Sequence, residues 1–164
     1  MWLVILFIFI GISTRLIPHF PNFAPIAAVA LFSGVYWKKK YGWLLPLGIF
    51  IASDLIVGIH QTILFTWGSI VLIYFLGKML QTRKTVGNTL LFTLVSSVLF
   101  FLITNFGVWL MGWYPQNLAG LVSCYANALP FFRISLISNF AYVTIFFGIY
   151  EYLTRKYKLA QETV

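Results

Sequence analysis

The chain has 164 residues, of which 61% are hydrophobic and 9% are charged, and its formal net charge is +8. Because soluble domains contain about 25% charged residues, this composition excludes a water-soluble fold, and the single cysteine, Cys124, excludes an internal disulfide bond. The basic residues stand at the ends of apolar segments, so they favour anionic membrane lipids over nucleic acid as partners, and we predict one membrane domain over residues 1–164.

Hydropathy predicts an all-α integral membrane protein, a bundle of six transmembrane helices, because an open sheet cannot satisfy its backbone hydrogen bonds in lipid. A bilayer core of roughly 30 Å needs about 20 helical residues, and the first two segments are shorter than that. The first segment lacks the basic start and small-residue cleavage site of a signal peptide, so we interpret it as a helix. The predicted helices cover residues 2–17, 24–37, 43–59, 62–80, 87–111 and 131–153.

Nine of the eleven Lys and Arg residues form three clusters that follow the second, fourth and sixth predicted helices. Short loops rich in Lys and Arg stay on the cytoplasmic side. With six helices and a cytoplasmic N-terminus, all three clusters fall on that side, together with the C-terminus. Omitting one helix would place them on opposite sides. The clusters are Lys38, Lys39 and Lys40; Lys78, Arg83 and Lys84; and Arg155, Lys156 and Lys158.

The predicted outer connections, residues 15–24, 58–62 and 112–130, contain both histidines, the cysteine and many amide and aromatic side chains. Ligand cavities usually combine apolar and aromatic walls with a few polar groups. We therefore expect a small-molecule site on the outer side. Trp109 and Asn105 lie near the outer end of the fifth helix and are candidates for its wall, although an amide within an apolar helix also suits interhelical hydrogen bonding.

Asp54 lies inside the third predicted helix, close to its outer end. An acid in a transmembrane helix faces the protein interior or water and has a partner. Arg15 and Arg133 are the cations on that side, so one interpretation is an ion pair between helices. The other is that Asp54 or an unpaired arginine binds a polar group of the ligand.

His19, His60 and Cys124 are all predicted on the outer side, but no two of them have the spacing of a metal-binding motif. We predict no metal site. Whether one of these residues is a single axial ligand to a metal-containing cofactor stays open. Neither paired carboxylates nor a hydrolase, metalloprotease or nucleotide-binding motif is present. The sequence therefore does not indicate an enzyme.

Small residues recur four positions apart in the second predicted helix, at Ala24 and Ala28 and at Ala30 and Gly34. This spacing places small side chains on one face and lets another helix approach closely. Packing within the bundle and docking of a separate membrane partner are both compatible with it.

Five segments of the sequence resemble a bacterial membrane family of unknown function whose members are described as transport proteins. The resemblance covers nearly the whole chain, although Asn139 stands where that family often has an acid. That family is similar in turn to the S components of energy-coupling factor (ECF) vitamin transporters. The segments are RLIPHFPNFAPI (15–26), SD (53–54), GIH (58–60), TNFGVW (104–109) and CYANALPFFR (124–133).

The resemblance to S components implies a six-helix protein of the bacterial inner membrane that binds a vitamin-like solute in an outward-facing cavity. It also implies docking, through small residues, to a membrane coupling subunit that carries ATPases; cobalamin is one candidate solute. The alternative is a structural or accessory subunit of a larger membrane complex. The predicted cavity residues are Arg15, His19, Asn22, Asp54, His60, Asn105, Trp109, Tyr125 and Arg133; the predicted docking residues are Ala24, Ala28, Ala30 and Gly34.

Overall fold

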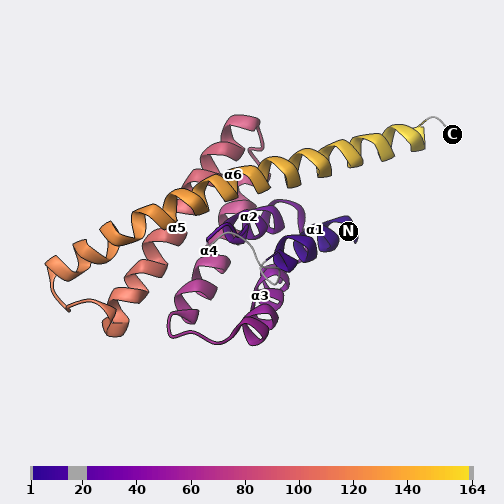
Figure 1. The fold of residues 1–164 in the computed structure, drawn as a ribbon. Helices are drawn as coiled ribbons and strands as arrows, with labels where there is room; N and C mark the ends of the chain where they lie inside the picture. Colours follow the sequence, from indigo (N-terminus) through magenta and orange to yellow (C-terminus); the bar gives the residue numbers. More distant parts are fainter. Residues whose placement is uncertain (1, 15–21, 163–164) are drawn as a thin grey trace.

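A computed structural model describes residues 2–14 and 22–162 of the chain, with side chains described up to Lys156. Over these ranges every regular element is a helix, which confirms the all-α class. Six α-helices follow one another along the chain (Figure 1). They are α1 (Trp2–Ser13), α2 (Ile26–Tyr36), α3 (Leu44–Val57), α4 (Ile63–Gln81), α5 (Val86–Val108), which continues as the π-helical turn η1 (Trp109–Trp113), and α6 (Leu118–Glu162).

The first five helices begin within two residues of their predicted starts, but the predicted start of the sixth was wrong. Residues 112–130 were expected to form a connection, whereas α6 begins at Leu118 and runs through Pro130. The side-chain oxygen of Asn117 accepts a hydrogen bond from the Gly120 N–H at 2.8 Å. Asn117 therefore caps the helix, and the Pro130 ring does not end it.

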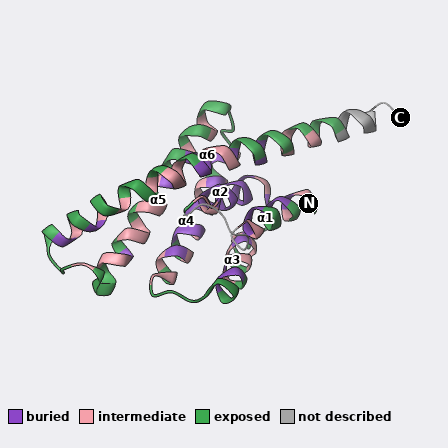
Figure 2. Cartoon of the chain, in the orientation of Figure 1, coloured by how far each residue is buried: buried purple, intermediate pink, exposed green. Residues whose placement is uncertain are grey.

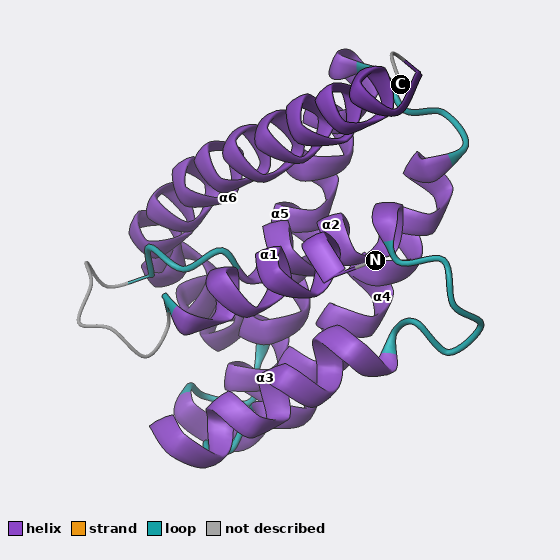
Figure 3. Cartoon of the chain, turned by 90° about the vertical axis from the view of Figure 1, so that its right-hand side faces the viewer, coloured by secondary structure: helices purple, strands orange, loops and turns teal. Residues whose placement is uncertain are grey.

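Helix α2 occupies the centre of the bundle. All of its residues from Ala27 to Val35 are buried, and it appears almost uniformly buried in Figure 2. Its most extensive packing is against α4, where the Cα of Gly34 lies so close that a Cβ built on Gly77 would be 2.8 Å from it. Figure 3 shows α6 and α3 on opposite sides of the bundle, with α1 and α2 between them.

Three of the described helices are long and apolar enough to cross a membrane. They are α4, α5 with its π-helical extension, and α6 up to Lys156. The other three, α1, α2 and α3, have 12, 11 and 14 residues and are also apolar. Many large apolar side chains on the outside of the bundle are exposed, as expected of surfaces that face lipid.

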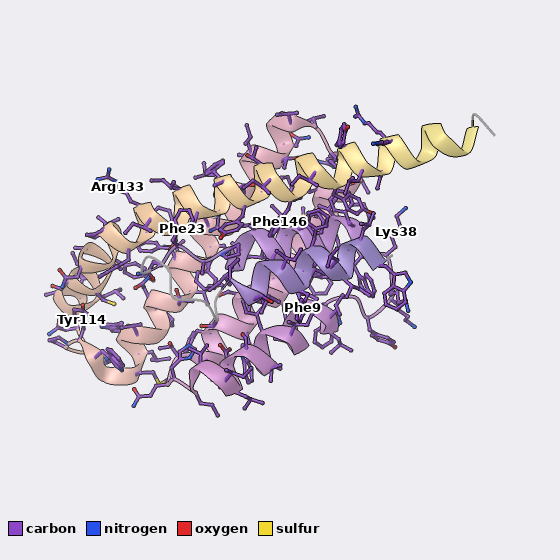
Figure 4. All side chains as sticks on the ribbon, turned by 45° about the vertical axis from the view of Figure 1, so that its right-hand side comes forward. Phe9, Phe23, Lys38, Tyr114, Arg133 and Phe146 are labelled. Carbon is purple, nitrogen blue, oxygen red and sulfur yellow. The ribbon has the colours of Figure 1, made fainter. Side chains whose placement is uncertain are left out.

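The three basic clusters converge at one end of the bundle, which we call the basic end. There the Tyr36 hydroxyl at the end of α2 donates a hydrogen bond to Oε1 of Glu151 on α6 at 2.6 Å. The same carboxylate forms an ion pair with Lys84, which precedes α5. Lys38 follows Tyr36 closely in sequence, and Arg155 lies one helical turn beyond Glu151. Figure 4 places Lys38 and Tyr114 at opposite ends of the molecule.

Candidate functional site

A cavity of about 280 Å³ lies between α5 and α6, beside the segment that precedes α2. Its wall contains four phenyl rings, three amide side chains, three hydroxyl side chains and one alanine, and none of these described lining residues is charged. The lining residues are Asn22, Ser97, Phe100, Phe101, Thr104, Asn105, Ala128, Phe131, Phe132, Ser135 and Asn139.

The periodicity of the α-helix accounts for this set of residues. On α5 they fall at positions 97, 100, 101, 104 and 105, and on α6 at positions 128, 131, 132, 135 and 139. Intervals of three and four residues place side chains on one face of a helix. The facing stripes of two neighbouring helices therefore form the two walls of the cavity.

Asn139 joins three helices at the inner end of the cavity. Its Oδ1 accepts a hydrogen bond from the backbone N–H of Ala28 at 3.2 Å, and its Nδ2 donates to the Ser97 hydroxyl at 3.1 Å. Pro25, the residue that precedes α2, provides no side-chain cap. Asn139 therefore supplies from α6 the hydrogen bond that a local cap would otherwise make to the first turn of α2. Both hydrogen bonds of the Asn139 side chain are therefore made to other helices.

Asn105 lies further along the wall on α5, toward the C-terminal end of this helix. Its Nδ2 donates a hydrogen bond to the Phe101 carbonyl oxygen one turn earlier, at 2.8 Å. Its backbone carbonyl oxygen accepts a hydrogen bond from the Cys124 thiol at 3.4 Å. Among the described residues, nothing hydrogen-bonds to Oδ1 of Asn105. Within the described part of the chain, the amide of Asn105 thus retains a free acceptor and a second N–H at the cavity.

The hydroxyl groups that line the cavity donate their protons to backbone carbonyls. Thr104 donates to Phe100 at 2.8 Å, Ser97 donates to Thr93 at 2.9 Å, and Ser135 donates to Asn22 at 3.2 Å. The last bond links α6 to the segment before α2. Asn22 itself has φ of +62°, a left-handed conformation that Asn tolerates better than most residues.

The phenyl rings pack against one another across the two helices. The rings of Phe101 and Phe132 have centroids 4.6 Å apart and are tilted by 37°. Phe101 also meets Tyr125 edge to face at 5.6 Å. Such ring pairs hold each other in place, so the aromatic wall has a defined shape.

Two of the predicted cavity residues, Asn22 and Asn105, line this cavity. Tyr125 lies behind its wall, because its hydroxyl donates to the Leu102 carbonyl at 2.7 Å while its ring packs on Phe101. Trp109 belongs to η1 and donates from Nε1 to the Pro115 carbonyl at 3.0 Å. It therefore braces the connection to α6 and does not line the cavity.

The other predicted cavity residues lie elsewhere. Asp54 is buried in α3, where it accepts a hydrogen bond from the Trp67 indole at 2.8 Å. His60 is exposed after α3, with Nε2 at 3.4 Å from the Thr66 hydroxyl. Arg133 is exposed on α6 and points away from the bundle (Figure 4). Arg15 and His19 are outside the described residues.

The small residues of α2 are used within the bundle. Ala28, Ala30 and Gly34 are buried, and a Cβ on Gly34 would collide with the carbonyl oxygen of Tyr74 on α4. Ala24 is partly buried just before α2. The packing interpretation accounts for these positions, and docking of a separate partner on them stays a prediction.

Cys124 was expected in the connection formed by residues 112–130, but it lies within α6, where it is only 2% exposed. Its thiol is directed at a backbone carbonyl. In the part of the chain that the structure describes, no group of three or more His, Cys, Asp or Glu side chains comes together.

Most of the cavity wall was not predicted from the sequence. On α5 only Asn105 was singled out, although Ser97 precedes Thr104 by seven positions on the same wall, and on α6 Ser135 precedes Asn139 by four. Polar residues at helical spacing within apolar helices are the signal that could have identified both stripes.

Comparisons with known proteins give one result at the level of the family. Neither a search of curated proteins nor a search of solved structures found a match. A family model described as a family of unknown function matches residues 1–162. The chain therefore belongs to the family of unknown function DUF6580.

Proposed function

We propose that this protein is a substrate-binding membrane transport protein of the ECF S-component type, which takes up a small vitamin-like solute. In this proposal all six helices lie in the bacterial inner membrane, both termini are cytoplasmic, and the cavity between α5 and α6 opens outward. The observation that carries the proposal is the position of this mixed aromatic and amide cavity, away from the basic end of the bundle.

The distance along α6 supports the assignment of sides. Asn139, at the inner end of the cavity, precedes Glu151 at the basic end by twelve residues, which is about 18 Å of helix. Lys- and Arg-rich loops favour the cytoplasmic side. If the basic end is cytoplasmic, the cavity lies in the half of the membrane that faces the outside.

The start of α2 fits a binding site within the membrane. Helix α2 begins at Ile26 beside Asn139 and Ser97, in the middle of the bundle. Non-helical backbone is tolerated at membrane depth only where it is buried in protein or lines a cavity, and transporters place broken helices at their substrate sites. The segment at Asn22, which lines the cavity and leads into α2, has this character.

The size of the cavity favours a small solute. Its volume of about 280 Å³ is at the lower limit of ligand pockets, which span roughly 300–1,000 Å³. A compound of one or two rings fits this space, whereas cobalamin needs the cavity to enlarge. Energy for uptake would come from a coupling subunit with ATPases, since the chain has no nucleotide-binding motif.

The test is to purify the full chain, identify co-purified small molecules by mass spectrometry, and measure thermal shifts with a panel of vitamins and their precursors. The variant Ala128→Leu fills the cavity, and Ala126→Leu adds the same bulk on the same helix at an exposed position outside it. We expect a co-purified solute and a thermal shift in the parent chain and in Ala126→Leu, with both lost in Ala128→Leu.

Two results would contradict the proposal. One is an empty protein that no member of the panel stabilises. The other is a solute bound equally by both leucine variants, because its site would then lie elsewhere. Stoichiometric partners without ATPase subunits would support the alternative of an accessory subunit in a membrane complex.

A further inference from the structure

We infer that the ligand of this cavity is an uncharged planar ring compound whose edge carries a hydrogen-bond donor beside an acceptor, and that Asn105 recognises this edge. The inference rests on the proposed binding function and specifies its substrate class. Lactams, pyrimidinones and aromatic carboxamides are compounds of this kind.

The charge of the lining residues is the first argument. None of the described residues that line the cavity is an acid or a base. Against the described lining residues, a charged ligand would lose its hydration without gaining a counter-ion, and burial of an unpaired ion costs several kcal/mol. In the first turn of α2, the Ala28 N–H is already bound by Asn139 and does not receive an anion.

The hydrogen bonds already made are the second argument. The protons of Ser97, Thr104 and Ser135 are donated to backbone carbonyls, and the oxygen of Asn139 is held by α2. Asn105 keeps its Oδ1 and one N–H. A carboxamide presents an acceptor and a donor side by side. It therefore pairs with a ring edge whose donor meets the amide oxygen and whose acceptor meets the amide N–H.

The shape of the wall is the third argument. Phe100 and Phe101 on α5 face Phe131 and Phe132 on α6 across the cavity, and Phe101 and Phe132 are already in ring contact. Phenyl faces favour flat aromatic partners in stacked or edge-on arrangements. Together with the volume of about 280 Å³, these walls favour a flat ring system over a flexible chain or a sugar.

The experiment compares neutral compounds with related anionic compounds on the purified full chain. The probe pairs are nicotinamide with nicotinate and uracil with orotate, and binding is measured by calorimetry and by displacement of any co-purified compound. We expect the neutral member of a pair to bind at least about tenfold more tightly, as one lost buried hydrogen bond predicts. N-methylation of uracil, which removes its donors, should weaken binding by a similar factor.

Asn105→Leu tests the residue, and Asn127→Leu is the control, because Asn127 is an exposed amide of α6 that does not line the cavity. We expect Asn105→Leu to lower the affinity for neutral probes at least about tenfold and Asn127→Leu to leave it unchanged. If Asn105→Leu does not fold, the methylated probe tests the same contact on the parent chain.

The outcomes separate this inference from the function on which it rests. Tighter binding of an anionic probe, or of an anionic co-purified compound, that is lost in Ala128→Leu would overturn the inference and leave the proposed transport function intact. The same holds if Asn105→Leu and N-methylation both leave affinity unchanged. Absence of any bound or stabilising compound would contradict both.

Discussion

Oδ1 of Asn139 accepts a hydrogen bond from the backbone N–H of Ala28, 111 residues earlier in the chain, at 3.2 Å. The bond fixes the first turn of α2 against the middle of α6, and the Asn139 Nδ2 extends the contact to Ser97 on α5. The residue is only 4% exposed. Asn139 thus connects α2, α5 and α6 at the level where the cavity ends.

We predict that Asn139→Ala destabilises the protein by about 1–3 kcal/mol, because the Ala28 N–H and the Ser97 hydroxyl both lose a buried partner. Asn139→Asp should retain part of the stability, since a carboxylate still accepts from the Ala28 N–H and a negative charge is favourable at a helix N-terminus. The bond to Ser97 is lost unless the Ser97 hydroxyl turns away from the Thr93 carbonyl. Thermal unfolding in detergent measures both. Asn127→Ala, at an exposed position of α6, is the control. Equal stability of Asn139→Ala and Asn127→Ala would contradict the capping role.

The contact between α2 and α4 leads to a second prediction. A Cβ on Gly34 would collide with the Tyr74 carbonyl oxygen and lie 2.8 Å from the Cα of Gly77, so backbone would have to move. We expect Gly34→Ala to cost about 1–3 kcal/mol. Gly68→Ala, on α4 with open space around its Cβ, should be neutral or stabilising by up to about 1 kcal/mol. Equal melting temperatures for the two variants would show that the helices separate easily.

The ion pair between Lys84 and Glu151 at the basic end leads to a third prediction. Both side chains are about one-third exposed, so solvent screens the attraction and we expect a coupling energy of about 0.5–1 kcal/mol. A double-mutant cycle with Lys84→Met and Glu151→Gln measures it. The coupling should weaken in high salt. A coupling of zero would mean that the Tyr36 hydrogen bond alone holds Glu151.

Hydropathy and charge predicted the helical class, the number of helices and the starts of five of them, because long apolar segments with basic ends leave few alternatives. The three clusters indeed meet at one end, through Tyr36, Lys84 and Glu151. The start of α6 was missed for a local reason. Pro130 was interpreted as a boundary, while the capping side chain of Asn117 was overlooked.

The site was harder to predict, because a cavity depends on which helices become neighbours. Asn105 was singled out as an amide near one end of its helix, and it lines the cavity; its role in binding stays a prediction. Its apolar partners across the cavity, such as Phe131 and Phe132 on α6, have no distinctive local sequence. Asp54 and Arg133 were chosen for their charge, but one is buried in α3 against Trp67 and the other is exposed. A charge in an apolar helix shows that burial of the residue costs free energy. It does not by itself show that the residue lines a cavity.

The orientation in the membrane leads to the last prediction. In a Cys124→Ala background, we expect an impermeant maleimide to label Ala119→Cys on intact cells. Thr82→Cys should react only after the membrane is opened, because it lies beside the basic cluster at Arg83 and Lys84. Both substituted positions are exposed, so the membrane and not protein packing limits their reaction.

The parent chain is the control for this labelling, because its only cysteine is 2% exposed and should react slowly on either side. The reverse labelling pattern would place the cavity on the cytoplasmic side, where a solute could not be captured for uptake. Labelling of both positions from outside would mean that both ends of the α5–α6 hairpin lie on the same side. The hairpin would then not cross the membrane. Either result would contradict the assignment of the basic clusters to the cytoplasm, on which the outward-facing cavity depends.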